Sequence, residues 1–199
     1  MSRRIIFDTD PGVDDAMALF FLLASPELEL EAVTTVFGNV DVEQTTRNAV
    51  ISGVSPPFKK SLRAEGVMPA VALVDPELTR TLPPAITAQT GMDAITQLIE
   101  SFLSRRARPL PQALVRDVLP AALVALPEAV RNGQSRPARE VMAHAALVSG
   151  MALANAGLGM AHGVAAALGA HLHVAHGLAC AAMLPIALKA NRSTCVPRL

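Results

Sequence analysis

The sequence predicts an α/β fragment at the N-terminus, with strand–helix–strand–helix order and parallel strands, followed by a mainly α-helical region. Charge and residue pattern both predict this division. The first 57 residues carry nine acids and three bases, and residues 58–199 carry eight acids and fourteen bases. Short segments rich in β-branched residues occur before residue 54, whereas long Ala- and Leu-rich segments dominate after residue 83.

Turn signals divide the N-terminal fragment into its elements. Residues 4–7 are predicted as the first strand, and Pro11-Gly12 as the turn that follows it. Asp14 can cap a helix over residues 15–24, which Ser25-Pro26 would end. Residues 28–37 are predicted as the second strand and residues 42–54 as the second helix.

The second region is predicted to contain one short strand and five helices. The strand covers residues 68–74, and the helices cover residues 83–103, 111–131, 136–156, 160–169 and 177–190. Pro120 and Pro127 are expected to kink or divide the second of these helices.

Composition restricts the class of protein. The chain is 51% hydrophobic, and its formal net charge is zero, which argues against a nucleic-acid partner. Two cysteines without motif spacing do not form a disulfide framework, so a cytoplasmic location is expected. Acids soon follow Arg3 and Arg4, which is not the pattern of a signal peptide.

An uncharged segment extends from residue 141 to residue 188. A membrane hairpin is one interpretation. All five histidines of the chain lie there, and lipid-facing helices avoid such groups. We therefore expect a buried helical core and no membrane partner. His144, His171 and His173 are expected to be surface or satisfied core residues, and Cys180 a small buried hydrophobe. A further hypothesis is self-association through uncovered apolar helices.

Four polar residues of the helical region suggest a metal site. Asp93 and Gln97 are four residues apart, so a helix presents both on one face. His162 and His176 are fourteen apart with Gly169 between them, which suits two helices joined by a turn. One carboxylate, one amide oxygen and two imidazoles could together hold a metal ion.

From about residue 58 to residue 191 the chain resembles the iron-containing alcohol dehydrogenases, whose helical domain is of the dehydroquinate-synthase type. The matching segments include Val74-Asp75-Pro76-Glu77-Leu78-Thr79, Thr90-Gly91-Met92-Asp93-Ala94, His162-Gly163, His176-Gly177 and Leu184-Pro185. They occur in the family's order and near its spacing.

This resemblance implies an oxidoreductase that uses iron or zinc and NAD(P) to interconvert alcohols and aldehydes. Asp93, His162 and His176 would hold the metal, and Gln97 stands where the family usually has its remaining histidine. The family's nucleotide-binding domain has no counterpart before Asp75, so an incomplete enzyme is expected. Residues 55–57 would be a junction, and residues 192–199 an unmatched tail.

The N-terminal fragment carries acids where the first strand is predicted to end. Four carboxylates within eight residues repel one another unless a cation lies between them, and their hard oxygens favour calcium or magnesium. Residues 1–54 resemble the nucleoside hydrolases through Asp8-Thr9-Asp10-Pro11-Gly12-Val13-Asp14-Asp15-Ala16 and Thr34-Thr35-Val36-Phe37-Gly38-Asn39. This second resemblance implies that Asp10 activates water, Asp10 and Asp15 bind calcium, Asp14 binds ribose hydroxyls and Asn39 lines the sugar pocket.

Three function classes follow from the sequence. The first is a metal-dependent alcohol dehydrogenase acting on a small alcohol or aldehyde. The second is a calcium-dependent nucleoside hydrolase. The third is a non-catalytic fusion of two fragments. The first is favoured because its resemblance spans most of the chain.

Overall fold

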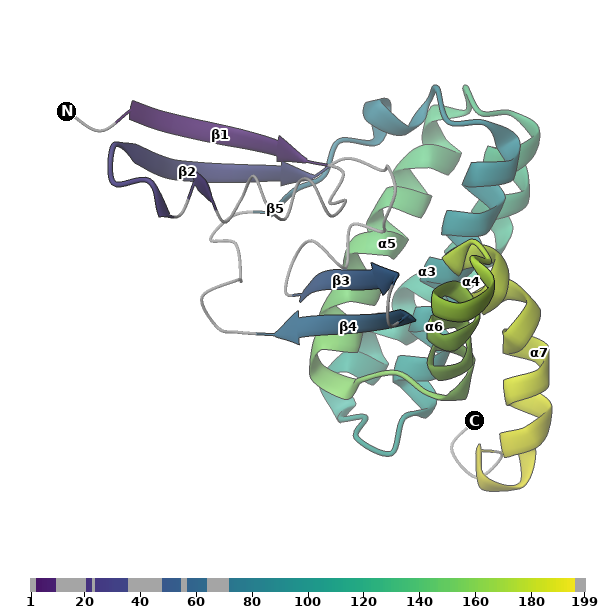
Figure 1. The fold of residues 1–199 in the computed structure, drawn as a ribbon. Helices are drawn as coiled ribbons and strands as arrows, with labels where there is room; N and C mark the ends of the chain where they lie inside the picture. Colours follow the sequence, from purple (N-terminus) through teal and green to yellow (C-terminus); the bar gives the residue numbers. More distant parts are fainter. Residues whose placement is uncertain are drawn as a thin grey trace.

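Strands form the N-terminal part of the chain, and helices form the remainder (Figure 1). The computed structural model describes residues 3–9, 21–22, 24–35, 48–54, 57–63 and 72–195. Over these residues the predicted fold class is confirmed, with parallel strands first and a mainly α-helical region after them.

Three parallel strands make the first sheet. β1 (Arg3–Thr9) pairs with β2 (Leu28–Thr35), and β2 pairs with the short β5 (Ala72–Leu73). The strands predicted at residues 4–7 and 28–37 are therefore confirmed where they are described. Asp10, Asp14, Asp15 and Asn39 lie outside the described residues, as does most of the helix predicted at residues 15–24.

The helix predicted for residues 42–54 is wrong over its second half. Residues Asn48–Val54 form β3, which pairs antiparallel with β4 (Pro57–Arg63). Three β-branched residues, Val50, Ile51 and Val54, favour a strand, and β4 supplies the hydrogen-bonding partner that a single segment cannot show. In the sequence, the expected junction at residues 55–57 follows the end of β3 and includes the first residue of β4, and both strands contact α6.

One 3-10 helix and five α-helices follow. Their bounds are η2 Pro76–Thr79, α3 Pro84–Leu103, α4 Pro109–Arg131, α5 Arg136–Ala156, α6 Met160–Leu172 and α7 His176–Cys195. Proline occupies a first-turn position of α3, α4 and α5, where its missing N–H costs no helical hydrogen bond. α4 is a single helix through Pro120 and Pro127, so neither residue divides it.

The connection between α6 and α7 lies later than expected. α6 continues through Gly169 to Leu172, and His173 ends it in the left-handed conformation, with φ of 54°. The predicted pair of helices, each carrying one imidazole, is nevertheless present.

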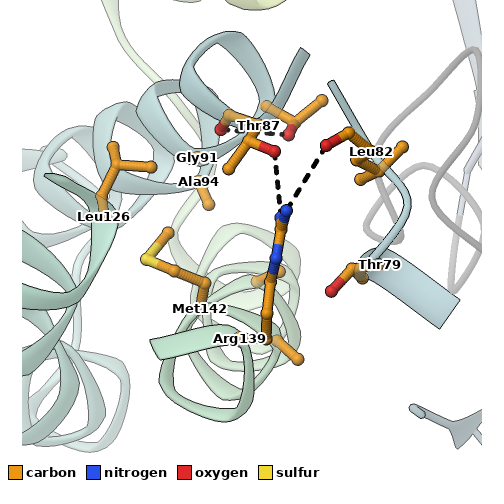
Figure 2. A pocket seen from close by; sticks show the side chains of 11 residues that line it. Thr79, Leu82, Thr87, Gly91, Ala94, Leu126, Arg139 and Met142 are labelled. Atoms are coloured by element: carbon orange, nitrogen blue, oxygen red, sulfur yellow. Dashed lines mark hydrogen bonds between the residues drawn. The ribbon is translucent and has the colours of Figure 1, made fainter. Parts of the chain in front are cut away.

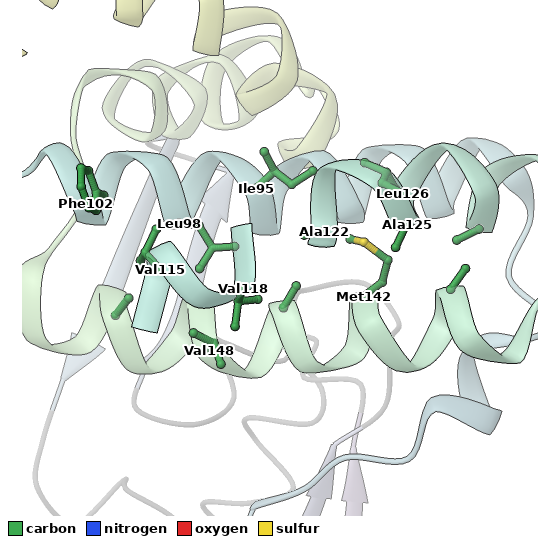
Figure 3. Close-up of a cluster of buried hydrophobic side chains, with 14 residues drawn as sticks. Ile95, Leu98, Phe102, Val115, Val118, Ala122, Ala125, Leu126, Met142 and Val148 are labelled. Carbon is green, nitrogen blue, oxygen red and sulfur yellow. The ribbon is translucent and has the colours of Figure 1, made fainter. Parts of the chain in front are cut away.

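The main core lies between α3, α4 and α5 (Figure 3). Ile95, Leu98 and Phe102 of α3 face Val115 and Val118 of α4, and Met142 and Val148 of α5 complete this layer. Leu98 is fully buried. α7 packs on another part of α3 and also contacts α6. α3 contacts each of α4, α5, α6 and α7.

Among the described residues, no single helix has both the length and the apolar character needed to cross a membrane. α5 and α6 taken together pass that test by length and composition, but they meet at an angle of 103°.

Candidate metal centre

The site begins on the middle of α3. Asp93 and Gln97 lie one turn apart and are both buried, with 1% and 2% of their surface exposed. The Oε1 atom of Gln97 accepts a hydrogen bond of 3.2 Å from the Ser149 hydroxyl of α5. α3 thus carries two buried polar side chains that need partners from neighbouring helices.

Two histidines approach Asp93 from α6 and α7. His162, in the first turn of α6, places its Nε2 atom 3.0 Å from Asp93 Oδ1. His176, the first residue of α7, places its Nε2 atom 3.8 Å from Asp93 Oδ2. The two imidazole rings lie edge to face with centroids 5.6 Å apart. The predicted convergence of Asp93, His162 and His176 is therefore present in the structure.

Cys180 is a fourth donor that the sequence analysis missed. It lies one turn after His176 on α7, is fully buried, and holds its Sγ atom 3.7 Å from His176 Nε2. One ligand atom each from Asp93, His162, His176 and Cys180 lies within 4.8 Å of the others. The spacing of four residues between His176 and Cys180 could have indicated this role, because it places both side chains on one face of a helix.

Glu100 is a second residue that the sequence analysis missed. It follows Asp93 by seven residues on the same face of α3, a spacing that could have indicated its role. Its carboxylate accepts hydrogen bonds from the backbone N–H groups of Gly159, Ala161 and His162, at 3.1, 2.7 and 3.2 Å. It also accepts one from Nδ1 of His162 at 2.7 Å. Glu100 therefore caps α6 and orients the His162 ring.

This hydrogen bonding fixes which nitrogen of His162 is available. Because Glu100 accepts from Nδ1–H, the Nε2 atom is the one presented to Asp93 and Cys180. Burial alone would lower the pKa of His162, but hydrogen bonds to Asp93, Cys180 and Glu100 outweigh it and raise the pKa to about 12. In the absence of a metal, a proton on Nε2 therefore lies between His162 and Asp93.

Burial acts in the same direction on the two other titrating groups, but the net change in pKa differs between them. Burial raises the pKa of the Cys180 thiol to about 12. Burial also opposes ionisation of Glu100, but hydrogen bonds from His162 and from the backbone of Ala161 and Gly159 lower its pKa overall. The charged Glu100 and the protonated His162 thus stabilise each other.

Two of the cavities in the described part of the chain lie beside α3, and neither is lined by the four donors. The smaller, of about 20 Å³, lies beside the buried Arg139, whose guanidinium donates to Thr87 Oγ1 and to the Leu82 carbonyl (Figure 2). It is large enough for one water molecule. The larger, of about 340 Å³, lies between α3, α6 and α7 and is lined partly by Glu100 and Gly159. Its volume is within the range of small-ligand sites.

The chemistry of the donors fits a transition metal. A carboxylate, two imidazoles and a thiol suit zinc or iron better than calcium or magnesium, which prefer oxygen ligands. His144, His171 and His173 are exposed and lie outside this cluster. Fold and site together define a helical domain whose buried side chains can hold a metal ion.

Two family models match the chain. The model of the Fe-containing alcohol dehydrogenase family, C-terminal, matches residues 87–199, which is more than half of the chain. The model of the inosine-uridine preferring nucleoside hydrolases matches residues 5–54. The chain therefore belongs to the Fe-containing alcohol dehydrogenase family, and it carries a short N-terminal segment similar to nucleoside hydrolases.

Curated relatives agree with this assignment. The chain is 39% identical to a probable alcohol dehydrogenase, EutG, of Escherichia coli over 173 residues, covering 87% of this chain and 43% of the relative. It is 34% identical to the 1-propanol dehydrogenase PduQ of Salmonella typhimurium over 195 residues, covering 96% of this chain and 52% of the relative. The chain spans about half the length of the relatives it matches.

Solved structures show the same fold. An alcohol dehydrogenase from Oenococcus oeni superposes with a TM-score of 0.85 at 28% identity, covering 98% of this chain and 55% of the other. A 1,3-propanediol oxidoreductase superposes with a TM-score of 0.81 at 29% identity, covering 94% and 53%. Sulfoacetaldehyde reductase from Bifidobacterium kashiwanohense, solved in complex with NAD+, superposes with a TM-score of 0.74 at 29% identity, covering 82% of this chain and 44% of the other.

Proposed function

We propose that the helical region is the metal-binding part of an alcohol dehydrogenase that interconverts a small alcohol and its aldehyde. The observation that supports this most directly is the convergence of donors from α3, α6 and α7 on one buried point. The names of the relatives, which include a 1-propanol dehydrogenase, support the substrate class.

Asp93, His162 and His176 are the proposed ligands of iron or zinc. Oδ1 of Asp93 lies beside His162, and Oδ2 lies beside His176. Glu100 holds the His162 ring so that Nε2 is directed at Asp93. Gln97 remains the fourth ligand of the sequence-based hypothesis. To bind a metal through Oε1, Gln97 would have to share or release its hydrogen bond from Ser149.

The bound metal would polarise the oxygen of the alcohol or carbonyl, which eases hydride transfer at the adjacent carbon. NAD(P) is the proposed hydride partner, and the NAD+ complex of one structural neighbour supports this choice. The residues of this chain would hold the site in place: Glu100 orients His162, and burial excludes bulk water from Asp93.

The test is the metal content of the purified chain and of matched variants. Asp93→Ala and His176→Ala should each lose the bound iron or zinc, because each removes one ligand. His171→Ala, an exposed histidine of α6, should retain it. NAD(P)-linked oxidation of 1-propanol by the metal-loaded chain would then test the substrate class. Unchanged metal stoichiometry in both ligand variants would contradict the proposed site.

A second candidate, calcium-dependent hydrolysis of nucleosides, is supported by the family match at residues 5–54. Asp10 would activate water, Asp10 and Asp15 would bind calcium, and Asp14 and Asn39 would contact the sugar. Calcium-dependent release of base from inosine or uridine, lost in Asp10→Ala, would favour this function. If no base is released at saturating calcium, this candidate is excluded.

We also propose that the protein is cytoplasmic, that its partner is a small molecule and that it associates with itself. Cys180 and Cys195 are both free thiols, which fits a reducing compartment. Sedimentation of the purified chain would measure the oligomeric state. A single monomeric species would count against self-association.

A further inference from the structure

Cys180 has a position that packing alone does not explain. It belongs to a small cluster with Ala165 and Ala179, where any small apolar side chain would fit. Its sulfur nevertheless faces the His176 ring, one turn away on α7, rather than only aliphatic neighbours. The helix spacing of four residues places both side chains on the same face.

Gln97 is a second candidate for the same role. Its only oxygen accepts a hydrogen bond from Ser149 on α5, a helix that contributes none of the four clustered donors. An amide oxygen is also a weaker ligand for zinc or iron than a thiolate. Two candidates for a fourth ligand therefore exist. Cys180 is favoured because its Sγ atom lies within 4.8 Å of the ligand atoms of Asp93, His162 and His176.

Three of the six separations between the donors are near the edges of a tetrahedral site, and the two that involve Asp93 go to its two different oxygens. Zinc bonds of about 2.0–2.1 Å to nitrogen and about 2.3 Å to sulfur give tetrahedral edges of about 3.6 Å between N and S and about 3.4 Å between N and O. The observed separations are 3.7 Å for Cys180 Sγ to His176 Nε2, 3.8 Å for His176 Nε2 to Asp93 Oδ2 and 3.0 Å for His162 Nε2 to Asp93 Oδ1. Small side-chain shifts would close such a site.

We propose that Cys180 is the fourth protein ligand of the metal held by Asp93, His162 and His176, and that its thiolate favours zinc over iron at this site. This inference rests on the proposed metal site. Soft sulfur ligands favour zinc, whereas the carboxylate and imidazole ligands do not distinguish it from iron as strongly. On binding, the thiol proton and the Nε2 proton of His162 leave to solvent, and the metal takes their place between the four donors.

Cobalt(II) is the probe that separates this inference from the proposed function. The whole chain, stripped of metal by a chelator and kept reduced without oxygen, would be titrated with cobalt(II) and followed by absorption. We expect one cobalt per chain, visible bands of tetrahedral cobalt, and a sulfur-to-cobalt charge-transfer band in the near ultraviolet. Cys180→Ser should lose the charge-transfer band and weaken zinc binding by at least about 10- to 100-fold, the loss that is typical even when only a residue that orients a ligand is changed. Cys195 is the other cysteine of α7. The control variant Cys195→Ser should keep both the charge-transfer band and the zinc affinity.

The outcomes are distinguishable. Cobalt bound at one per chain without a charge-transfer band, or with a band that survives in Cys180→Ser, would overturn the role of Cys180 and leave the metal site standing. No cobalt binding at all would overturn the metal site and this inference with it. X-ray absorption of the zinc-loaded wild-type chain is a second measurement that needs no variant. It should show one sulfur at about 2.3 Å, and a shell of nitrogen and oxygen alone would contradict the proposal.

Discussion

At the scale of single residues, Glu100 links helix formation to the proposed metal centre. The same carboxylate caps the N-terminus of α6 and binds the His162 ring. A helix N-terminus favours a negative charge, so the position serves the helix as well as the histidine. A change at Glu100 should therefore alter both metal affinity and stability.

We predict that Glu100→Gln weakens metal binding by about 10- to 100-fold, because residues that orient a ligand typically have effects of this size. The amide can accept only through one oxygen, so some of the bonds to α6 are also lost. Competition with a chromophoric chelator would measure the affinity. Glu128→Gln, which changes an exposed ion pair with Arg131, is the matched control and should bind metal normally.

At the scale of elements, Gly177 sets the approach of α7 to α3. A Cβ atom at this position would collide with the backbone carbonyl of Gln89, which cannot move away as a side chain could. His176 is the preceding residue. The close approach of the two helices therefore places His176 beside Asp93.

We predict that Gly177→Ala pushes α7 away from α3 and lowers both thermal stability and metal affinity. Gly163→Ala is the control, because a Cβ there meets nothing within 4 Å and lies next to His162. This control should be neutral or stabilising, by up to about 1 kcal/mol, since alanine favours helix more than glycine. Equal metal affinity in the two variants would contradict the role assigned to Gly177.

The larger of the two buried hydrophobic clusters in the described residues lies between α3, α4 and α5. Leu98→Ala should destabilise the chain by about 2–5 kcal/mol, because Leu98 is fully buried and its removal leaves a cavity. Leu123→Ala on α4 removes the same atoms from a side chain that is 51% exposed. It should change the free energy of unfolding by no more than about 0.5 kcal/mol. Urea denaturation of both variants would measure the difference, and similar losses would contradict this core.

At the scale of the whole molecule, the buried site links stability to pH and metal. In the metal-free chain, His162 has its pKa raised from 6.5 to about 12, and Cys180 from 9.0 to about 12. Both groups hold protons more tightly in the folded state, so the unfolded state binds fewer protons above the ordinary pKa of His162. The stabilisation from charged His162 is complete below pH 6.5 and is lost as the pH rises toward 12.

We therefore predict that the free energy of unfolding of the metal-free chain falls between about pH 7 and about pH 9. His162→Gln should flatten this dependence, whereas His171→Gln should leave it unchanged. Added zinc should stabilise the chain by about 2.7 kcal/mol at a hundred times its dissociation constant, and more strongly at higher pH as protons compete less. A stability that rises over this pH range without metal would contradict the prediction.

The sequence by itself determined the helical elements and three of the converging donors. Repeating apolar positions and prolines at first turns fixed α3, α4 and α5 closely, because these signals are local. Asp93, His162 and His176 could be found because each stands in a short motif with its own spacing. The parallel pairing of β1 and β2 followed from their order and residue types.

Only the tertiary structure decided what depends on contacts between distant segments. Residues Asn48–Val54 are a strand because β4 pairs with them, which no local pattern of that segment shows. Glu100 and Cys180 join the site because α6 and α7 pack against α3. The residues that donate backbone hydrogen bonds to Glu100 lie 59 to 62 positions after it in the sequence. Helix packing supplies these neighbours, and the sequence records only which faces are available for it.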